Sequence, residues 1–144
     1  MSETSLELIT LNGVAKNMDE AINEAAEMLI QAGAVEAGYK ESMFARESSV
    51  STYMGNYLAI PHGTLEGSNL VRTSAVAIIR YMAPINWGGE QVKFVIGIAG
   101  KNGAHLESLG RIAEIFSNTS TVEKILDAKS ESEIRHIFSL GNPS

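Results

Sequence analysis

The chain of 144 residues contains no cysteine. This absence excludes disulfides, thiolate metal sites and a cysteine nucleophile, and it fits a reducing compartment. No apolar run approaches the roughly 18 residues that a membrane span requires. The N-terminal residues 1–4 are acidic and have neither the basic region nor the apolar block of a secretory signal. We therefore expect a cytoplasmic protein with no direct membrane insertion.

Positive charge is also scarce, because 11 lysines and arginines stand against 17 aspartates and glutamates, a net charge of −6. A nucleic-acid partner is disfavoured, since phosphate backbones are held by clusters of Lys and Arg. The glycine-rich motifs of nucleotide and dinucleotide sites and the G-x-S-x-G motif of hydrolases are missing as well. No carboxylate stands at ligand spacing to His62 or His105, so we expect neither a metal nor a cofactor.

The apolar pattern that is present predicts a single domain over residues 1–144, with ordinary apolar and charged fractions. Strands are expected at 6–11, 57–60, 72–80 and 92–99, and helices at 17–33, 39–51, 104–117, and after capping boxes at 120–123 and 130–133. The predicted fold class is α/β, a three-layer α/β/α sandwich around a mixed β-sheet, in the order strand, two helices, three strands, three helices. The short connection after Ile60 and a turn region at 84–89 each allow antiparallel pairing.

The segment 53–64 carries the first candidate functional residue, His62. Gly55-Asn56 is typical of a turn, and residues 57–60 form an apolar run of strand length. Pro61 restricts its own backbone and that of the residue before it, so His62 is expected on a stiffened strand end. Gly63 has no side chain and would let a large group approach. The structural alternative is a half-exposed histidine that bonds to backbone or water.

Arg46 and His105 are the other two candidates, because each interrupts an apolar helical stripe. Arg46 shares its stripe with Tyr39, Met43 and Val50, and it either packs its stem at the stripe's edge or aims its guanidinium into a crevice to hold an anion. His105 lies in the first turn of a helix that follows a central strand, where α/β proteins place ligand crevices. It is otherwise a satisfied core histidine.

Trp87 and His136 receive structural interpretations. Trp87 is expected to cover the edge of the core, and His136 lies off the apolar face of the last helix and is expected at the surface.

Together, His62, His105 and Arg46 fit phosphoryl transfer through a histidine. A neutral imidazole carries a lone pair that can attack phosphorus, while the other ring nitrogen donates to an oxygen and fixes the tautomer. The transition state spreads negative charge over the equatorial phosphoryl oxygens, which a planar guanidinium and further donors would bind. No metal is needed if the donor already carries an activated phosphoryl group.

The sequence resembles the enzyme IIA component of the mannitol/fructose family of the bacterial phosphoenolpyruvate:sugar phosphotransferase system, most closely the mannitol type. The resemblance covers nearly the whole chain and is carried by the pattern G-x-x-[IL]-A-[IV]-P-H-[GS]-T at 55–64, by 43–47 (M-F-A-R-E), and by 95–99 with His105-Leu106. It implies the same sandwich fold and a single IIA domain. It also implies that the tele nitrogen (Nε2) of His62 is phosphorylated, with Arg46 and His105 as its active-site partners.

The partners that the resemblance implies are the phosphocarrier protein HPr as donor and the IIB component of the mannitol permease as acceptor. Three alternatives stay open at this point. The chain could be a regulatory protein of the nitrogen type, phosphorylated at the same histidine but acting by protein binding. It could serve fructose or another sugar, or it could be an interaction module whose histidine is silent.

Overall fold

The computed structural model describes residues 6–64, 66–101 and 104–140, in which five strands form one mixed sheet in the order β1-β4-β5-β3-β2. The pairs β1/β4 and β3/β5 are parallel, and the pairs β4/β5 and β2/β3 are antiparallel. The strands are β1 Leu6–Thr10, β2 Tyr53–Gly55, β3 Leu58–Ala59, β4 Ala75–Trp87 and β5 Glu90–Ala99.

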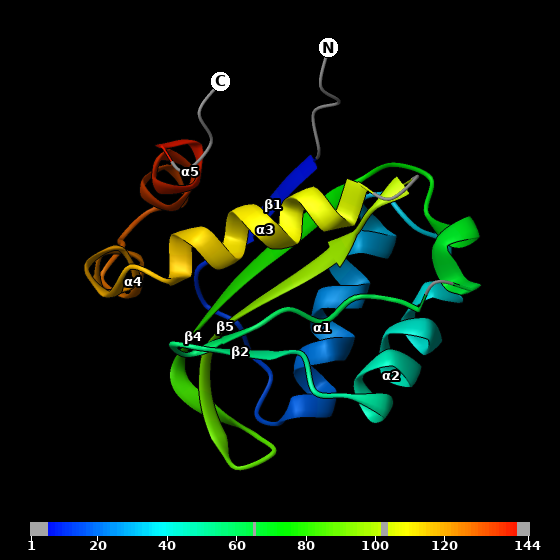
Figure 1. Ribbon diagram of the computed structural model, residues 1–144, viewed down its shortest axis with the longest axis horizontal. Coiled ribbons are helices and arrows are strands. Elements are labelled where there is room, and N and C mark those ends of the chain that lie inside the picture. The colour runs from blue at the N-terminus through cyan, green and yellow to red at the C-terminus, as the bar shows by residue number, and fades with distance from the viewer. Residues whose placement is uncertain (1–5, 65, 102–103, 141–144) are drawn as a thin grey trace.

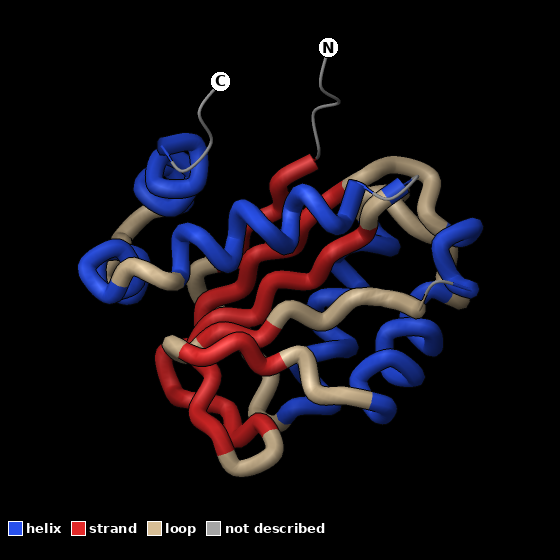
Figure 2. Tube along the Cα trace, viewed as in Figure 1, coloured by secondary structure: helices blue, strands red, loops and turns tan. Residues whose placement is uncertain are grey.

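Helices cover both faces of this sheet, which Figure 2 shows as the layer between them. One face carries α1 (Met18–Gln31) and α2 (Tyr39–Ser49), and the other carries α3 (Ala104–Phe116), followed by α4 (Thr119–Leu126) and α5 (Glu131–Leu140) (Figure 1). A 3-10 helix, η1 (Glu66–Leu70), lies between β3 and β4, in the connection for which the sequence predicted no helix. The predicted α/β class and three-layer arrangement are confirmed.

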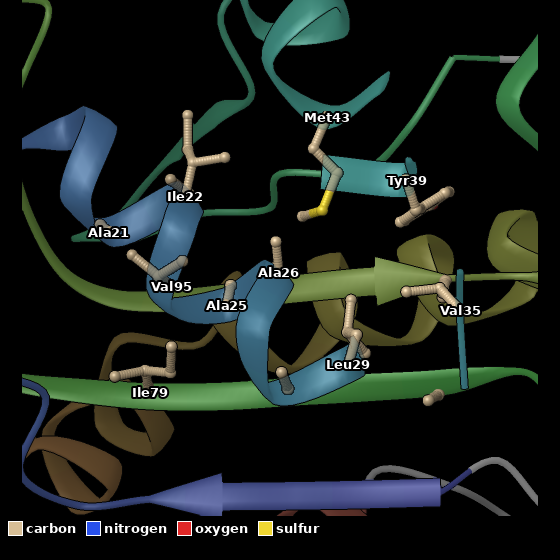
Figure 3. Close-up of a cluster of buried hydrophobic side chains, with 14 of the residues drawn as sticks. Ala21, Ile22, Ala25, Ala26, Leu29, Val35, Tyr39, Met43, Ile79 and Val95 are labelled. Carbon is tan, nitrogen blue, oxygen red and sulfur yellow. The ribbon is translucent and has the colours of Figure 1, made fainter. Parts of the chain in front are cut away.

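The first helix forms as its sequence predicts. The Asn17 side chain accepts the backbone N–H of Glu20 at 2.8 Å and caps α1. Ile22, Ala25 and Leu29 follow at helical spacing and are fully buried against the sheet, beside Met43 of α2 (Figure 3).

The sheet has one strand more than predicted. Residues 55–57 form the expected turn, with φ angles of 92° at Gly55, 50° at Asn56 and 69° at Tyr57. This turn joins two strands, β2 and β3, into a hairpin, so the predicted strand at 57–60 is reduced to Leu58–Ala59. A three-residue edge strand is too short to show a pattern in the sequence.

The central hairpin also differs in detail. β4 and β5 pair antiparallel, as the turn region allowed, but Pro84 and Trp87 lie within β4 rather than in the turn. The chain reverses at Gly88 and Gly89, which both have positive φ, and the register shifts between Arg80 and Ile85, where a bulge tolerates the proline. The antiparallel pairing that the connection after Ile60 allowed is not formed, because β5 lies between β3 and β4.

The two short helices on the second face begin differently from one another. The expected capping box at 120–123 is wrong, because Asn118 caps α4 by accepting the N–H of Thr121 at 3.1 Å. The box at 130–133 is confirmed in one half, since Ser130 Oγ accepts the N–H of Glu133 at 3.2 Å. The Glu133 carboxylate accepts the N–H of Lys129 at 3.3 Å in place of that of Ser130. No helix among the described residues is long and apolar enough to cross a membrane.

The parallel pairing of β3 with β5 brings two distant segments to the same edge of the sheet. Beyond β3, the carbonyl of Pro61 accepts the N–H of Ile98 at 2.9 Å, and His62 forms a parallel bridge with Ile98. Beyond β5, the chain passes Gly100 and begins α3 at Ala104. The carboxyl ends of these strands therefore define the place to look for a site.

Candidate active site

A pocket of about 350 Å³ opens at this edge of the sheet. It combines residues of α2, of the segment between β3 and η1, of η1 itself and of the end of β5. Two of the three predicted site residues, His62 and Arg46, line it together. The full lining consists of Tyr39, Arg46, His62, Gly63, Thr64, Glu66, Ser68 and Gly100.

The ring of His62 is oriented by its own backbone. Its Nδ1 lies 2.9 Å from the carbonyl oxygen of Ile60. Since a carbonyl oxygen only accepts hydrogen bonds, Nδ1 carries the proton of the neutral ring, and Nε2 carries the lone pair. Pro61 fixes its own φ and restricts Ile60, the residue before it, to extended backbone, so both residues that separate the ring from this carbonyl are stiffened by the local sequence.

The segment after His62 is anchored by two side chains of α2. The hydroxyl of Tyr39 accepts the N–H of Gly63 at 2.9 Å and donates to the carbonyl of Ile98 at 2.9 Å. The hydroxyl of Ser42 accepts the N–H of Thr64 at 2.8 Å and lies 2.9 Å from the Thr64 hydroxyl. Tyr39 thus links Gly63, the residue after His62, to Ile98, the bridge partner of His62 on β5.

Burial raises the pKa of the Tyr39 hydroxyl above its ordinary value, and the hydrogen bond from the Gly63 N–H opposes this in part. The hydroxyl therefore keeps its proton at neutral pH. It needs that proton, because the carbonyl of Ile98 accepts it.

Gly63 is in close contact with α2, which the sequence did not predict. A Cβ at this position would lie 2.5 Å from Cε1 of Tyr39 and 2.8 Å from Oγ of Ser42. The missing side chain therefore makes room for the two α2 anchors. Gly63 also lines the pocket, so the expectation that it lets a large group approach His62 stays a prediction.

Arg46 is half-buried in the last turn of α2 and combines both interpretations of its role. Its Nη1 donates to the carbonyl of Val50 at 2.7 Å, which fits a cation at a helix C-terminus. It also lines the pocket, and a guanidinium has further donors for an anion there. The expected stripe was wrong at Val50, which is 64% exposed.

Glu47 takes the place that Val50 was expected to hold. It continues the spacing of Tyr39 and Met43 by one helical turn, and these three are the buried residues of α2. Its carboxylate accepts hydrogen bonds from Thr52 N at 2.9 Å, Thr52 Oγ1 at 2.6 Å and Trp87 Nε1 at 3.0 Å. The four-residue spacing was a signal in the sequence, but a charged residue is not expected in a core.

The structure describes the side chain of His136 but not that of His105. His105 belongs to the first turn of α3, but its side chain lies outside the described residues, so its role stays a prediction. His136 is exposed on α5, as expected. The described part of the chain holds no group of three His, Cys, Asp or Glu side chains arranged to bind a metal ion.

The fold and the pocket define an α/β domain that presents a histidine, with an arginine beside it, where a central parallel strand pair ends. The chain belongs to the family described as phosphoenolpyruvate-dependent sugar phosphotransferase system, EIIA 2, whose sequence model matches residues 4–140.

Similar proteins of known name agree with this family. The chain is 43% identical over 136 residues to the mannitol-specific phosphotransferase enzyme IIA component of Halalkalibacterium halodurans, covering 93% of this chain and 94% of that protein. It is 45% identical over 130 residues to the component of the same name from Staphylococcus aureus, covering 90% of each. Among solved structures, the complex of enzyme IIAMtl with phosphorylated enzyme IIBMtl from Escherichia coli matches with a TM-score of 0.86 and 30% identity, over 91% of this chain and 93% of the matched chain.

Proposed function

We propose that this protein is a cytoplasmic phosphoryl carrier of the mannitol phosphotransferase system. It takes a phosphoryl group from phospho-HPr on Nε2 of His62 and passes it to the IIB component of the mannitol permease. The observation that carries the proposal is the contact of 2.9 Å between Nδ1 of His62 and the Ile60 carbonyl, which leaves the lone pair on Nε2 in a pocket shared with Arg46.

The transfer step needs no cofactor. Nε2 of His62 forms a bond to phosphorus while the bond between phosphorus and the donor breaks, and the donor keeps that electron pair. The imidazole gains positive charge as the bond forms, and the Ile60 carbonyl, which accepts the Nδ1 proton, stabilises it. The second transfer, to IIB, reverses these events at the same nitrogen.

Arg46 and His105 are assigned to the phosphoryl oxygens. The planar guanidinium of Arg46 binds two of them side by side, and the contact of its Nη1 with the Val50 carbonyl holds the guanidinium in place. His105 and the N-terminal N–H groups of α3 supply further donors, because a helix N-terminus favours negative charge.

Mannitol as the sugar is supported by the names of the similar proteins from H. halodurans and S. aureus. The IIB partner is supported by the complex from E. coli. HPr as donor follows from the family resemblance.

The test is a two-step transfer assay with purified chain. Phospho-HPr should label the wild type with acid-labile phosphate, and His62→Ala should abolish labelling while His136→Ala, the matched surface histidine, leaves it unchanged. Arg46→Ala and His105→Ala should remain folded and slow the transfer, each by about 2.7–4 kcal/mol of lost transition-state stabilisation.

Onward transfer is then measured to a panel of IIB partners. Transfer to mannitol IIB supports the carrier role, and transfer only to another sugar's IIB would reassign the sugar. Labelling without any onward transfer would favour a regulatory protein of the nitrogen type. Labelling that survives His62→Ala would move the site elsewhere, and no labelling of the wild type would leave a silent interaction module.

A further inference from the structure

We propose that the buried carboxylate of Glu47 is a positioning residue that sets the orientation of His62 and Arg46 for phosphoryl transfer. The inference rests on the proposed function of His62 as the phosphoryl acceptor. Glu47 does not line the pocket itself, so it would act through the backbone that holds the two pocket residues.

The environment of Glu47 is unusual for a carboxylate. Its side chain is buried, and none of the ion pairs found among the described residues involves it. Its partners are instead the backbone and hydroxyl of Thr52 and the indole of Trp87. A buried charge held by neutral donors is costly, so its presence beside a site calls for a role beyond packing.

A continuous hydrogen-bonded path leads from Glu47 to the ring of His62. The carboxylate fixes Thr52 through both its N–H and its hydroxyl. The carbonyl of Thr52 accepts the N–H of Ile60 at 3.1 Å. The carbonyl of Ile60 accepts Nδ1 of His62 at 2.9 Å. A displacement of Thr52 would therefore move the group that selects the tautomer of the nucleophile.

A second path leads from Glu47 to Arg46. The guanidinium of Arg46 donates to the carbonyl of Val50, where the chain leaves α2. Thr52 follows two residues later. Its two hydrogen bonds to Glu47 hold the chain after Val50 against the last turn of α2. The Val50 carbonyl, which accepts from the guanidinium, is thus fixed by α2 before it in the chain and by Thr52 after it.

A substitution at Glu47 can separate the effect of its hydrogen bonds from the effect of its charge. In Glu47→Gln, the amide oxygen can take the place of Oε2 and accept from Thr52 N and Trp87 Nε1. The amide NH₂ then donates to the Thr52 hydroxyl, which reverses from donor to acceptor. All three contacts survive without the charge. Glu47→Ala loses all three.

The experiment measures single-turnover transfer from phospho-HPr and the ¹⁵N NMR signals of the His62 ring. Glu47→Gln should match the wild type in both. Glu47→Ala should lower the maximal rate by about 10–100-fold, as misplaced reacting groups do, with an unchanged half-saturating HPr concentration and a reduced share of the Nδ1–H tautomer.

Trp87→Phe is the matched control. It removes one hydrogen bond from the same carboxylate and lowers stability, but it leaves the path through Thr52 intact, so the folded protein should transfer at the wild-type rate. Should Glu47→Ala fail to fold, Thr52→Val and Thr52→Ser decide the matter. Only the valine variant loses the hydroxyl contact, and it should transfer more slowly than the serine variant and shift the His62 signals.

Two outcomes would overturn the inference. One is a folded Glu47→Ala protein that has the wild-type transfer rate and His62 ring signals. If Glu47→Ala does not fold, the equivalent outcome is a Thr52→Val protein with the same rate and ring signals as Thr52→Ser. The other is a slow Glu47→Gln protein with wild-type ring signals, which would assign the effect to charge. A wild type that accepts no phosphoryl group would instead refute the proposed function, while the NMR arm would still report on the orientation of His62.

Discussion

The two faces of the sheet are built from different side chains. The face under α1 and α2 is rich in alanine, and Gly97 of β5 lies so close to α1 that an added Cβ would be 2.9 Å from the Cβ of Ala25. The face under α3, α4 and α5 is filled by branched and aromatic side chains. These are Ile9, Ile78, Ile96, Ile98, Ile112, Ile115, Ile125, Ile134, Phe94 and Phe116, with Leu58, Ile60, Val76, Val122 and Ala128.

Buried and half-buried polar groups follow the same division. On the α1/α2 face, Tyr39 and Glu47 reach the backbone around the pocket, and Glu24 binds the Tyr81 hydroxyl at 2.7 Å and the backbone N–H groups of Val14 and Ala15. On the other face, Arg80 donates to the carbonyls of Leu11, Leu126 and Ala128, near the C-terminal end of α4, where a cation is favoured.

This difference shows how the pocket is held. Small side chains let α1 lie close to the sheet, and polar side chains of α2 beside it reach the backbone next to His62. On the opposite face, bulky side chains stabilise the helices by burial. We therefore expect core changes beside α2 to alter transfer as well as stability, and equal changes in the core beside α4 and α5 to alter stability alone.

The largest effect is expected from truncating one core residue on each face. Met43→Ala and Ile125→Ala both remove fully buried side chains, and each should lower the free energy of unfolding by about 2–5 kcal/mol. At a temperature where both variants are folded, only Met43→Ala should slow transfer from phospho-HPr. Urea unfolding and the transfer rate measure the two effects, and equal loss of transfer in both variants would contradict the comparison.

Glycine-to-alanine changes should have opposite signs on the two faces. Gly97→Ala overpacks the contact with Ala25 and should destabilise the protein by about 1–3 kcal/mol. Gly110→Ala, on α3, meets no atom within 4 Å and should stabilise it by about 0.5–1 kcal/mol. Thermal unfolding monitored by circular dichroism gives both values, and a stabilised Gly97→Ala protein would show that α1 can retreat freely.

Two tyrosines sharpen the comparison within the α1/α2 face. Tyr39→Phe removes its hydrogen bonds to Gly63 and Ile98, at about 0.5–1.5 kcal/mol for each, and should also slow transfer. Tyr81→Phe removes a hydrogen bond to Glu24 and should cost stability without slowing transfer, because the other hydrogen-bond partners of Glu24 are the N–H groups of Val14 and Ala15 and not the backbone around His62. Denaturation and single-turnover transfer of both variants test this, and a slow Tyr81→Phe protein would mean that the whole face acts on the site.

The smallest effect is a dependence on alkaline pH. Burial raises the pKa of Tyr39, and burial together with Glu24 raises that of Tyr81. Above about pH 10 the unfolded chain loses these phenolic protons while the folded protein keeps them, so the free energy of unfolding should fall as pH rises. Tyr81→Phe should reduce this slope in urea titrations between neutral and alkaline pH, whereas an unchanged slope would exclude Tyr81 as its source.

Local patterns were enough to predict much of this molecule. The cap at Asn17 and the apolar spacing of α1 depend on neighbours within a few residues, and both are found in the structure. Arg46 was recognised because it departs from an apolar stripe, and it lines the pocket. The contacts of Gly63 with α2 and the burial of Glu47 could not be predicted, because their partners lie on other elements.

The sequence by itself determined the helices, the central strands and the histidine at a strand end, since periodicity, capping and proline geometry act over short distances. Only the tertiary structure decided that β5 lies between β3 and β4, that the His62 segment meets α2, and that a carboxylate is buried beside the pocket. These three features depend on which surfaces of the helices and the sheet pack together. Burial of the whole sheet between two helical layers selects this packing, and no local pattern in the sequence does.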